Sequence, residues 1–439
     1  MLRTLLISAL AALPAFAQAP LRLTLKQAVE IATAPEGNTR VKLVAEAVDQ
    51  ANARSAQARA ALLPNVDASV SQMNQTRNLA AMGIRIDLPI PGFSFPGRVG
   101  PFNTFDARIS GTQTIFDFGA IRRLQASRAA VRASEAEGES TRDEVAAQVA
   151  MLYVNALAAR AHVEAAESNV SLAEALARTA ENRRKAGTGT GIESTRAEVQ
   201  LANERQRLLV ARNQFRQAQL QLLRGMGVSL GGELELADPL EYRPVEALSD
   251  REAVDRALTA RADWKAQQRR QESARLSYSG TKFERLPSLA GFADYGSIGN
   301  GFGSAVPTRT YGVALRVPLF DGGRRDARRS ESLSQFRAEQ IRTDDLKSQI
   351  DLEVRLALDA QRSAEEQVKV AVEGLSLAER EVEQARRRYE AGVANSIEPT
   401  DAQTRLERAR DNHIAALAGY NIARIHVAQS MGNIRQVIQ

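Results

Sequence analysis

The chain has 439 residues, of which 44% are hydrophobic and 25% charged, as is typical of a folded protein. It contains no cysteine, which excludes disulfides, thiolate metal sites and a cysteine nucleophile. The net charge of +6 does not indicate nucleic-acid binding, because acidic residues interleave with the arginines along the helical segments and give an ion-paired helix surface. We predict no nucleic-acid partner.

The N-terminus is predicted to be a signal peptide of residues 1–17. Arg3 supplies a short positive region, residues 5–13 form an apolar core, and Ala15-Phe16-Ala17 fits the small-x-small rule for cleavage. The mature protein would begin at Gln18 and be exported. A short buried helix is the alternative interpretation of this segment.

The first half of the chain reads as helices, then strands, then helices again. Periods near 3.6 residues predict helices, and alternation of apolar and polar residues predicts strands with one apolar face. The expected elements are helices 24–34 and 39–62, a strand at 65–74, a loop at 77–103, a strand from 105, a helix at 120–186, a turn at 187–191 and a helix at 192–227. The 120–186 helix would span roughly 100 Å at about 1.5 Å per residue, so it needs a coiled-coil partner or the wall of a tube.

The second half repeats this order. We expect helices 248–260 and 263–285, strands at 289–295 and 310–319 with a loop at 296–307, a helix at 322–391 and a helix at 397–431. The landmark Phe116-Asp117 recurs as Phe320-Asp321, and the glycine turn at Gly187 recurs at Gly392, 204 and 205 residues later. This predicts a duplicated domain, with repeats at 18–228 and 248–439 and a connector at 229–247.

The strand pattern favours a membrane barrel. One face of each strand is apolar and the other polar, which suits a closed transmembrane barrel with a wet lumen. A sheet edge cannot face lipid, and four strands are too few to close, so the chain is expected to oligomerise. A trimer would give twelve strands continued by twelve long helices as a hollow α-helical tube. A periplasmic sandwich packed on the helices remains the alternative.

With these landmarks in order, the chain resembles the TolC-like outer membrane efflux family over about residues 21–432. The helix-to-strand turns contain Pro64 and Pro287. The strand-to-helix junctions contain Asp117, Gly119, Asp321 and Gly322, and the hairpin tips contain Arg184, Lys185, Gly187, Arg388, Tyr389 and Gly392. Any single motif is weak, but the ordered set occurs twice.

The resemblance implies a mixed α/β membrane protein. It would be a homotrimer with a twelve-stranded barrel, four strands per chain, in contact with outer membrane lipid, and a periplasmic α-helical tunnel. A periplasmic adaptor would dock on the tips and link the duct to an inner-membrane transporter of RND, ABC or MFS type, for efflux or type I secretion. The duct would be passive, with no catalytic residue, cofactor or metal, and substrate specificity would belong to the inner-membrane partner.

The resemblance also carries residues over at the tips. The adaptor is expected to dock at Arg184, Lys185, Gly187, Glu193, Arg388, Tyr389, Gly392 and Ser396. Glu398 and Asp401 would form two carboxylate rings at the periplasmic entrance; an ordinary acidic helix N-terminus is the alternative. The chain departs from the family pattern at Ala394, where the best-known member has a latch arginine, and at Arg196, which stands where the second repeat has Asp401.

One rival function remains from the sequence. A periplasmic adaptor or scaffold would also contain a coiled-coil hairpin, although it would normally flank a single hairpin with compact β domains. An exported enzyme has no supporting constellation of residues.

Overall fold

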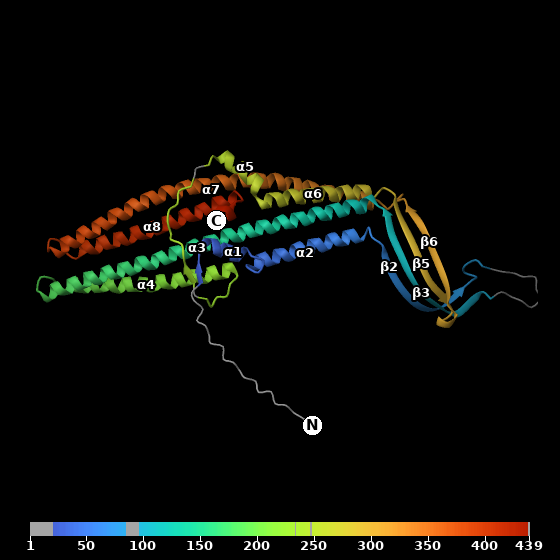
Figure 1. Cartoon of the computed structure of the whole chain (residues 1–439), viewed down its shortest axis with the longest axis horizontal. Coiled ribbons are helices and arrows are strands. Elements are labelled where there is room, and N and C mark those ends of the chain that lie inside the picture. Colours follow the sequence, from blue (N-terminus) through green and yellow to red (C-terminus); the bar gives the residue numbers. More distant parts are fainter. Residues whose placement is uncertain (1–20, 85–95, 233, 246–247, 438–439) are drawn as a thin grey trace, which may run out of the picture. The chain divides into compact units, whose positions relative to one another are not determined.

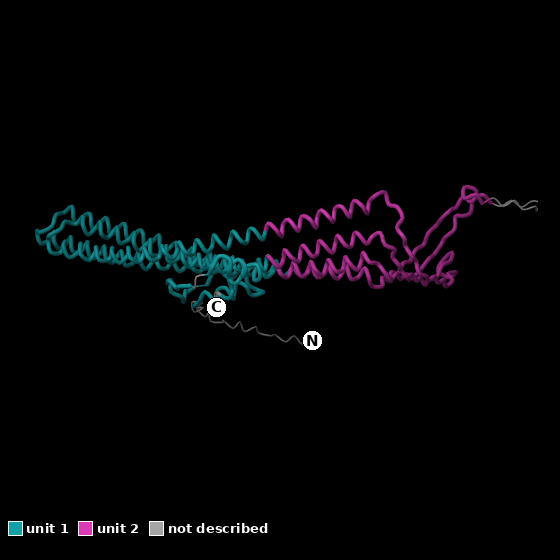
Figure 2. The backbone as a smooth tube through the Cα atoms, turned by 90° about the horizontal axis from the view of Figure 1, so that it is seen from above, with its two compact units in different colours: residues 1–46, 137–263, 346–439 teal, residues 47–136, 264–345 magenta. Residues whose placement is uncertain are grey.

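The computed structural model describes residues 21–84, 96–232, 234–245 and 248–437, so the predicted signal peptide and its cleavage site lie outside the described residues. The chain forms two compact units (Figure 2). The hairpin unit comprises Met1–Glu46, Glu137–Asp263 and Leu346–Gln439, and the sheet unit comprises Ala47–Ala136 and Trp264–Asp345. Each unit contains residues from both halves of the chain. The units therefore do not correspond to the two predicted repeats, and the repeat boundaries remain a prediction.

The sheet unit holds a four-stranded antiparallel sheet in the order β2-β3-β5-β6 (Figure 1). Its strands are β2 (Asn65–Asn78), β3 (Arg98–Phe116), β5 (Ser288–Gly299) and β6 (Val306–Arg316). Within this sheet β2 and β6 are the outer strands, each paired on one side. Val66, Val70, Tyr311, Val313 and Leu315 leave large apolar side chains exposed on these outer strands. The sheet is therefore not a closed core within one chain.

Several strand boundaries differ from the sequence prediction. β2 and β3 extend into the expected 77–103 loop, where the pairing register shifts between Gln75 and Arg77; part of that loop, residues 85–95, lies outside the described residues. β5 and β6 similarly shorten the expected 296–307 loop, leaving one 3₁₀ turn at Phe302–Ser304. β6 ends at Arg316 rather than 319, because Pro318 has no N–H to donate to a ladder.

The two strand hairpins have the same register in both halves of the chain. Asn65 lies opposite Thr112 in the first hairpin, and Ser288 lies opposite Arg316 in the second. These shifts of 223 and 204 residues equal the shifts between Pro64 and Pro287 and between Asp117 and Asp321. The repeated landmarks in the sequence thus coincide with equivalent positions in the sheet.

The junction residues end helices and begin strands, or the reverse. α2 (Thr39–Ala60) and α6 (Ala262–Phe283) stop shortly before Pro64 and Pro287, each of which directly precedes a strand. At the other end of the strands, Asp117 Oδ1 accepts a hydrogen bond from the backbone N–H of Ala120, and Asp321 Oδ2 accepts one from Arg325. Both aspartates thus satisfy backbone donors at the start of a long helix.

The glycines beside these aspartates have different roles in the two halves. A Cβ on Gly119 would come within 3.1 Å of the Asp117 carboxylate that caps the helix. Gly322 and Gly323 instead adopt φ values of +68° and +85°, a left-handed conformation that side chains other than glycine disfavour. Phe118 also packs on Phe283, with ring centroids 5.7 Å apart.

The long helices form two hairpins whose tips lie in the hairpin unit (Figure 1). The first is α3 (Phe118–Lys185) with α4 (Gly191–Met226), and the second is α7 (Arg324–Glu390) with α8 (Ile397–Ser430). α3 and α7 contain 68 and 67 residues, which confirms the predicted length. None of the described helices is both long and apolar enough to cross a membrane.

Short elements complete the hairpin unit. They are β1 (Leu21–Leu23), α1 (Leu25–Thr33), β4 (Leu234–Leu236), α5 (Asp250–Ala260) and α9 (Ile434–Val437). The sequence period could not predict β1, β4 or α9, because elements of three or four residues are too short to show one. Leu23, Leu222, Leu234 and Ile434 are buried together with residues of α3 and α8 in the main core of this unit.

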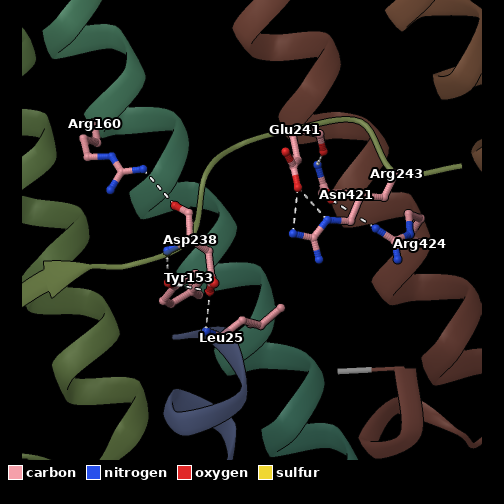
Figure 3. A network of polar contacts seen from close by, with 8 residues as sticks. All are labelled: Leu25, Tyr153, Arg160, Asp238, Glu241, Arg243, Asn421 and Arg424. Carbon is pink, nitrogen blue, oxygen red and sulfur yellow. Dashed lines mark hydrogen bonds and ion pairs between the residues drawn. The ribbon is translucent and has the colours of Figure 1, made fainter. Parts of the chain in front are cut away.

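The connector after β4 contacts both hairpins (Figure 3). At one end, Asp238 Oδ2 accepts hydrogen bonds from the Leu25 N–H at 2.7 Å and the Tyr153 hydroxyl at 2.8 Å, and Arg160 of α3 donates to the Asp238 carbonyl. At the other end, Asn421 of α8 donates to the Glu241 carbonyl at 3.1 Å. Burial raises the pKa of Tyr153, and the hydrogen bond with Asp238 raises it further. Asp238 and Glu241, within the predicted 229–247 connector, therefore bond to different hairpins.

Candidate functional site

The two hairpin tips close with the same backbone hydrogen bonds. Gly187 and Gly392 have φ values of +72° and +74°. The N–H of Gly187 donates to Arg184 and the next N–H to Arg183; the N–H of Gly392 donates to Tyr389 and the next to Arg388. This is the Schellman arrangement, which selects glycine at the left-handed position. The tip glycines noted in the sequence are thus required by the turn.

At the first tip, the predicted docking residues are partly occupied within their own hairpin. Arg184 Nε donates to Glu181 at 2.7 Å, and Lys185 Nζ lies 3.5 Å from the same carboxylate. Ser194 of α4 also donates to Glu181. The hydrogen bond from Arg184 is the largest of the causes that lower the pKa of Glu181 to about 2. Glu193 accepts a hydrogen bond from the N–H of Thr190, so its carboxylate caps α4.

A contact between hairpins joins Arg183 of α3 to Tyr389 of α7. The Arg183 guanidinium donates to the Tyr389 carbonyl and lies 4.6 Å from the centroid of its ring. Tyr389 is only 2% exposed, and its hydroxyl has no hydrogen-bond partner among the described residues. Burial raises the Tyr389 pKa, and the negative charge of Glu193 raises it further. Tyr389 is therefore buried at the contact between hairpins.

At the second tip, the two predicted entrance carboxylates have different surroundings. Arg388 Nε donates to Glu398 Oε1 at 2.8 Å, so the charge of Glu398 is partly balanced within its own hairpin. Asp401 is exposed and forms no ion pair within the described ranges. Ser396, also predicted to dock the adaptor, is buried, and its hydroxyl finds no partner in the described part of the chain.

Asp401 and Arg196 line one groove of about 270 Å³ between α4 and α8. In the sequence, these two residues occupy equivalent positions of the two repeats but carry opposite charges. The fold places them across from each other, with the exposed Ile192, Val199 and Ile397 along the same groove. Ala394 stands at the position where the best-known family member has a latch arginine, so this chain has no charged side chain there. The Arg183–Tyr389 pair is a polar contact between the two tips.

Sequence reasoning missed Arg183, Glu181 and Ser194 at this site. No local pattern separates Arg183 from Arg184, its neighbour in a run of basic residues. Only the packing of α3 on α7 selects Arg183 for the contact with Tyr389. Among the described residues, no group of three or more acidic or histidine side chains could hold a metal ion.

Solved structures share this arrangement of elements. The outer membrane channel CmeC of Campylobacter jejuni matches 93% of this chain and 86% of its own with a TM-score of 0.78 at 18% identity. The outer membrane protein VceC of Vibrio cholerae matches 93% of this chain and 96% of its own with a TM-score of 0.77 at 17% identity. The fold is that of an outer membrane channel.

The sequence defines the family within that class. Residues 31–228 and 253–433 match the model of the outer membrane efflux protein family, and the chain belongs to that family. It is 25% identical to the pyoverdine export outer membrane protein OpmQ of Pseudomonas putida, over 88% of this chain and 81% of the relative. It is also 25% identical, over 51% of this chain and 47% of the relative, to the alkaline protease secretion protein AprF of Pseudomonas aeruginosa.

The protein is therefore an outer membrane exit duct for efflux or secretion, located in the outer membrane and extending into the periplasm. This confirms the resemblance noted in the sequence and the channel function predicted from it. The rival prediction, a periplasmic adaptor, does not fit a match that covers both halves of the chain.

Proposed function

We propose that three copies of the chain close into a twelve-stranded barrel and a continuous helical tube that conducts substrates passively. The observation that carries this proposal is the four-stranded sheet, in which β2 and β6 are each paired on one side only. Unpaired backbone groups cannot face lipid, so the two edges must pair with other strands. Three copies supply twelve strands, which is within the range of known barrels.

The apolar side chains of the outer strands support a position in lipid. Val66 and Val70 on β2, and Val313 and Leu315 on β6, are all more than half exposed in one chain. The alternate positions include polar residues, such as Asp67 and Ser69 on β2 and Thr310 and Arg316 on β6, as expected of a wet lumen. Burying the apolar face in hydrocarbon removes it from water, which favours insertion.

The duct would serve an efflux or secretion system with a periplasmic adaptor and an inner-membrane transporter of RND, ABC or MFS type. The names of OpmQ and AprF, one for pyoverdine export and one for alkaline protease secretion, support this role. The adaptor would dock at the tips, through exposed residues such as Arg184, Lys185, Arg388 and Gly392. Tyr389 and Ser396 are buried, so they would shape the tip rather than touch the partner.

The periplasmic entrance would carry carboxylate rings from Glu398 and Asp401. Asp401 is exposed and would supply most of the charge, because Arg388 partly balances Glu398. Three such carboxylates around an axis attract cations and repel anions. The entrance would thus favour cations, with Arg196 beside Asp401 limiting the effect.

Two measurements test the duct. The purified full chain should run as an oligomer on an unheated denaturing gel and as a monomer after heating. In a planar bilayer it should give stepwise single-channel currents. A chain that fractionates as a soluble periplasmic monomer, or that gives no current in bilayers, would contradict the proposal.

A further inference from the structure

A cavity of about 740 Å³ lies between α3, α4 and α8, entirely within the hairpin unit. Its volume is within the roughly 300–1,000 Å³ of small-molecule pockets. The charged lining comes from Glu204 and Arg207 of α4 and from Glu407 and Asp411 of α8, with His162 of α3 beside them. Three carboxylates therefore share the cavity with one guanidinium.

Glu204 is the buried member of this group. Its side chain is 1% exposed. Oε1 accepts a hydrogen bond from the Gln200 amide at 2.6 Å and lies 3.3 Å from Arg207 Nη1. Oε2 is fully buried and has no hydrogen-bond partner among the described residues. A buried anionic oxygen without a donor is strongly unfavourable, so this atom calls for a donor that the chain does not supply.

The cavity is lined by fewer positive charges than carboxylates. Arg207 also contacts Glu407 of α8, so one guanidinium is divided between two carboxylates on different helices. Asp411 Oδ1 lies 3.2 Å from His162 Nδ1, which adds charge only when the imidazole is protonated. With His162 neutral, two negative charges remain uncompensated. Burial and the nearby Glu407 both raise the pKa of Glu204, as expected for a buried carboxylate beside another carboxylate.

We propose that this cavity binds an aliphatic diammonium ion, with one ammonium group donating to the Glu204 carboxylate and the other balancing Asp411. Two positive charges match the two uncompensated carboxylates. The uncharged lining suits a short amine, because amides can accept its N–H groups and apolar side chains can contact its methylene chain. These lining residues are Asn203, Asn412, Ala166, Val210 and Ala415. Asn169 also lines the cavity, but its Oδ1 already accepts a hydrogen bond from Arg410.

An organic cation fits this lining better than a metal ion. No set of three or more acidic or histidine side chains in the described ranges is arranged to ligate a metal. Ammonium groups need only hydrogen-bond acceptors and negative charge, which Glu204 and Asp411 provide. Because α4 and α8 belong to different hairpins, a bound diammonium ion would hold the hairpins together. The site does not depend on the proposed trimer or on its conductance.

The test is isothermal titration of the purified full chain in detergent with putrescine at low ionic strength. We expect saturable binding at one site per chain. The substitution Glu204→Gln should weaken binding by about tenfold or more, the size of a lost hydrogen bond to a charged group. Glu198→Gln, which removes an exposed carboxylate from the same helix, should leave the affinity within about twofold.

Three outcomes would overturn the proposal. These are no saturable heat with the wild-type chain, equal affinities for wild type and Glu204→Gln, and equal Glu204-dependent binding of MgCl₂, which would assign the cavity to metal ions. If Glu204→Gln fails to fold, a variant at the other proposed ammonium-binding carboxylate replaces it. The second variant is Asp411→Asn, which removes the other carboxylate assigned to the ligand, is 57% exposed and should not disturb folding; we expect it to weaken putrescine binding by about tenfold as well.

Discussion

Arg183 and Tyr389 join the two helical hairpins at their tips. The Arg183 guanidinium donates to the Tyr389 carbonyl and stacks over its ring at 4.6 Å. A charged hydrogen bond and a cation–π contact each contribute on the order of 1 to 2 kcal/mol. In this chain, with alanine at position 394, this pair is a polar contact that opening of the tips would have to break.

Arg183→Ala should therefore favour the open tip. Loss of about 2 kcal/mol would shift the closed-to-open equilibrium by roughly thirtyfold. Single-channel recording in planar bilayers would show longer or larger openings. Arg178→Ala serves as the control, because this exposed arginine of the same helix forms no ion pair among the described residues. Equal open times for both variants would exclude the latch role of Arg183.

The two entrance carboxylates should differ in their effect on ion selectivity. Asp401→Asn should reduce cation selectivity and divalent block more than Glu398→Gln, because Arg388 already balances part of the Glu398 charge. Arg388→Gln should have the opposite sign and increase cation selectivity. Reversal potentials in a salt gradient measure the ion selectivity of all three variants. Unchanged selectivity in Asp401→Asn would rule out the carboxylate ring.

Gly392 and Gly374 make a matched pair of glycines on the second hairpin. Gly392→Ala should lower stability by about 1 kcal/mol, because its φ of +74° disfavours a side chain. Gly374→Ala, within α7, should raise stability by roughly 0.5–1 kcal/mol, because a Cβ there meets no atom within 4 Å and alanine favours helix. Circular dichroism during urea unfolding would separate the two. The same sign for both variants would contradict this account.

The connector should depend on Asp238. Asp238→Ala removes the acceptor for the Leu25 N–H and the Tyr153 hydroxyl, at an expected cost of roughly 1–3 kcal/mol. Urea unfolding followed by circular dichroism measures the loss. Glu235→Ala, an exposed residue of β4, is the control and should change stability by less than about 0.5 kcal/mol. An equal loss in both variants would show that the connector acts through its backbone alone.

Glu204 should make stability depend on pH. Its pKa in the folded chain is raised above the ordinary value of 4.5, so the folded state binds a proton that the unfolded state has already released. Its contribution to stability therefore falls as pH rises from about 4.5 through the raised pKa. Glu204→Gln should flatten this dependence, and melting temperatures measured across pH 4 to 8 would show it. Identical pH profiles for wild type and variant would contradict the burial argument.

Several parts of this structure were predictable because they depend on local periods. The 3.6-residue period without proline specified α3 and α7 to within a few residues. Alternation specified the strands, although β2 and β3 extend further than their patterns because pairing continues past a change in register. β1 and β4 could not be predicted: each has three residues, and their pairing joins segments more than 200 residues apart.

The sequence by itself determined the repeated order of elements, the glycines of the two tips and the carboxylates near them, because these are set by backbone geometry over a few residues. Tertiary structure alone decided which side chains meet. It joined Arg183 to Tyr389, placed Arg196 and Asp401 along one groove, and buried Glu204 with an unpaired oxygen. The physical reason is that charge balance and burial depend on which helices pack together, and residues far apart in sequence carry no local signal of that contact.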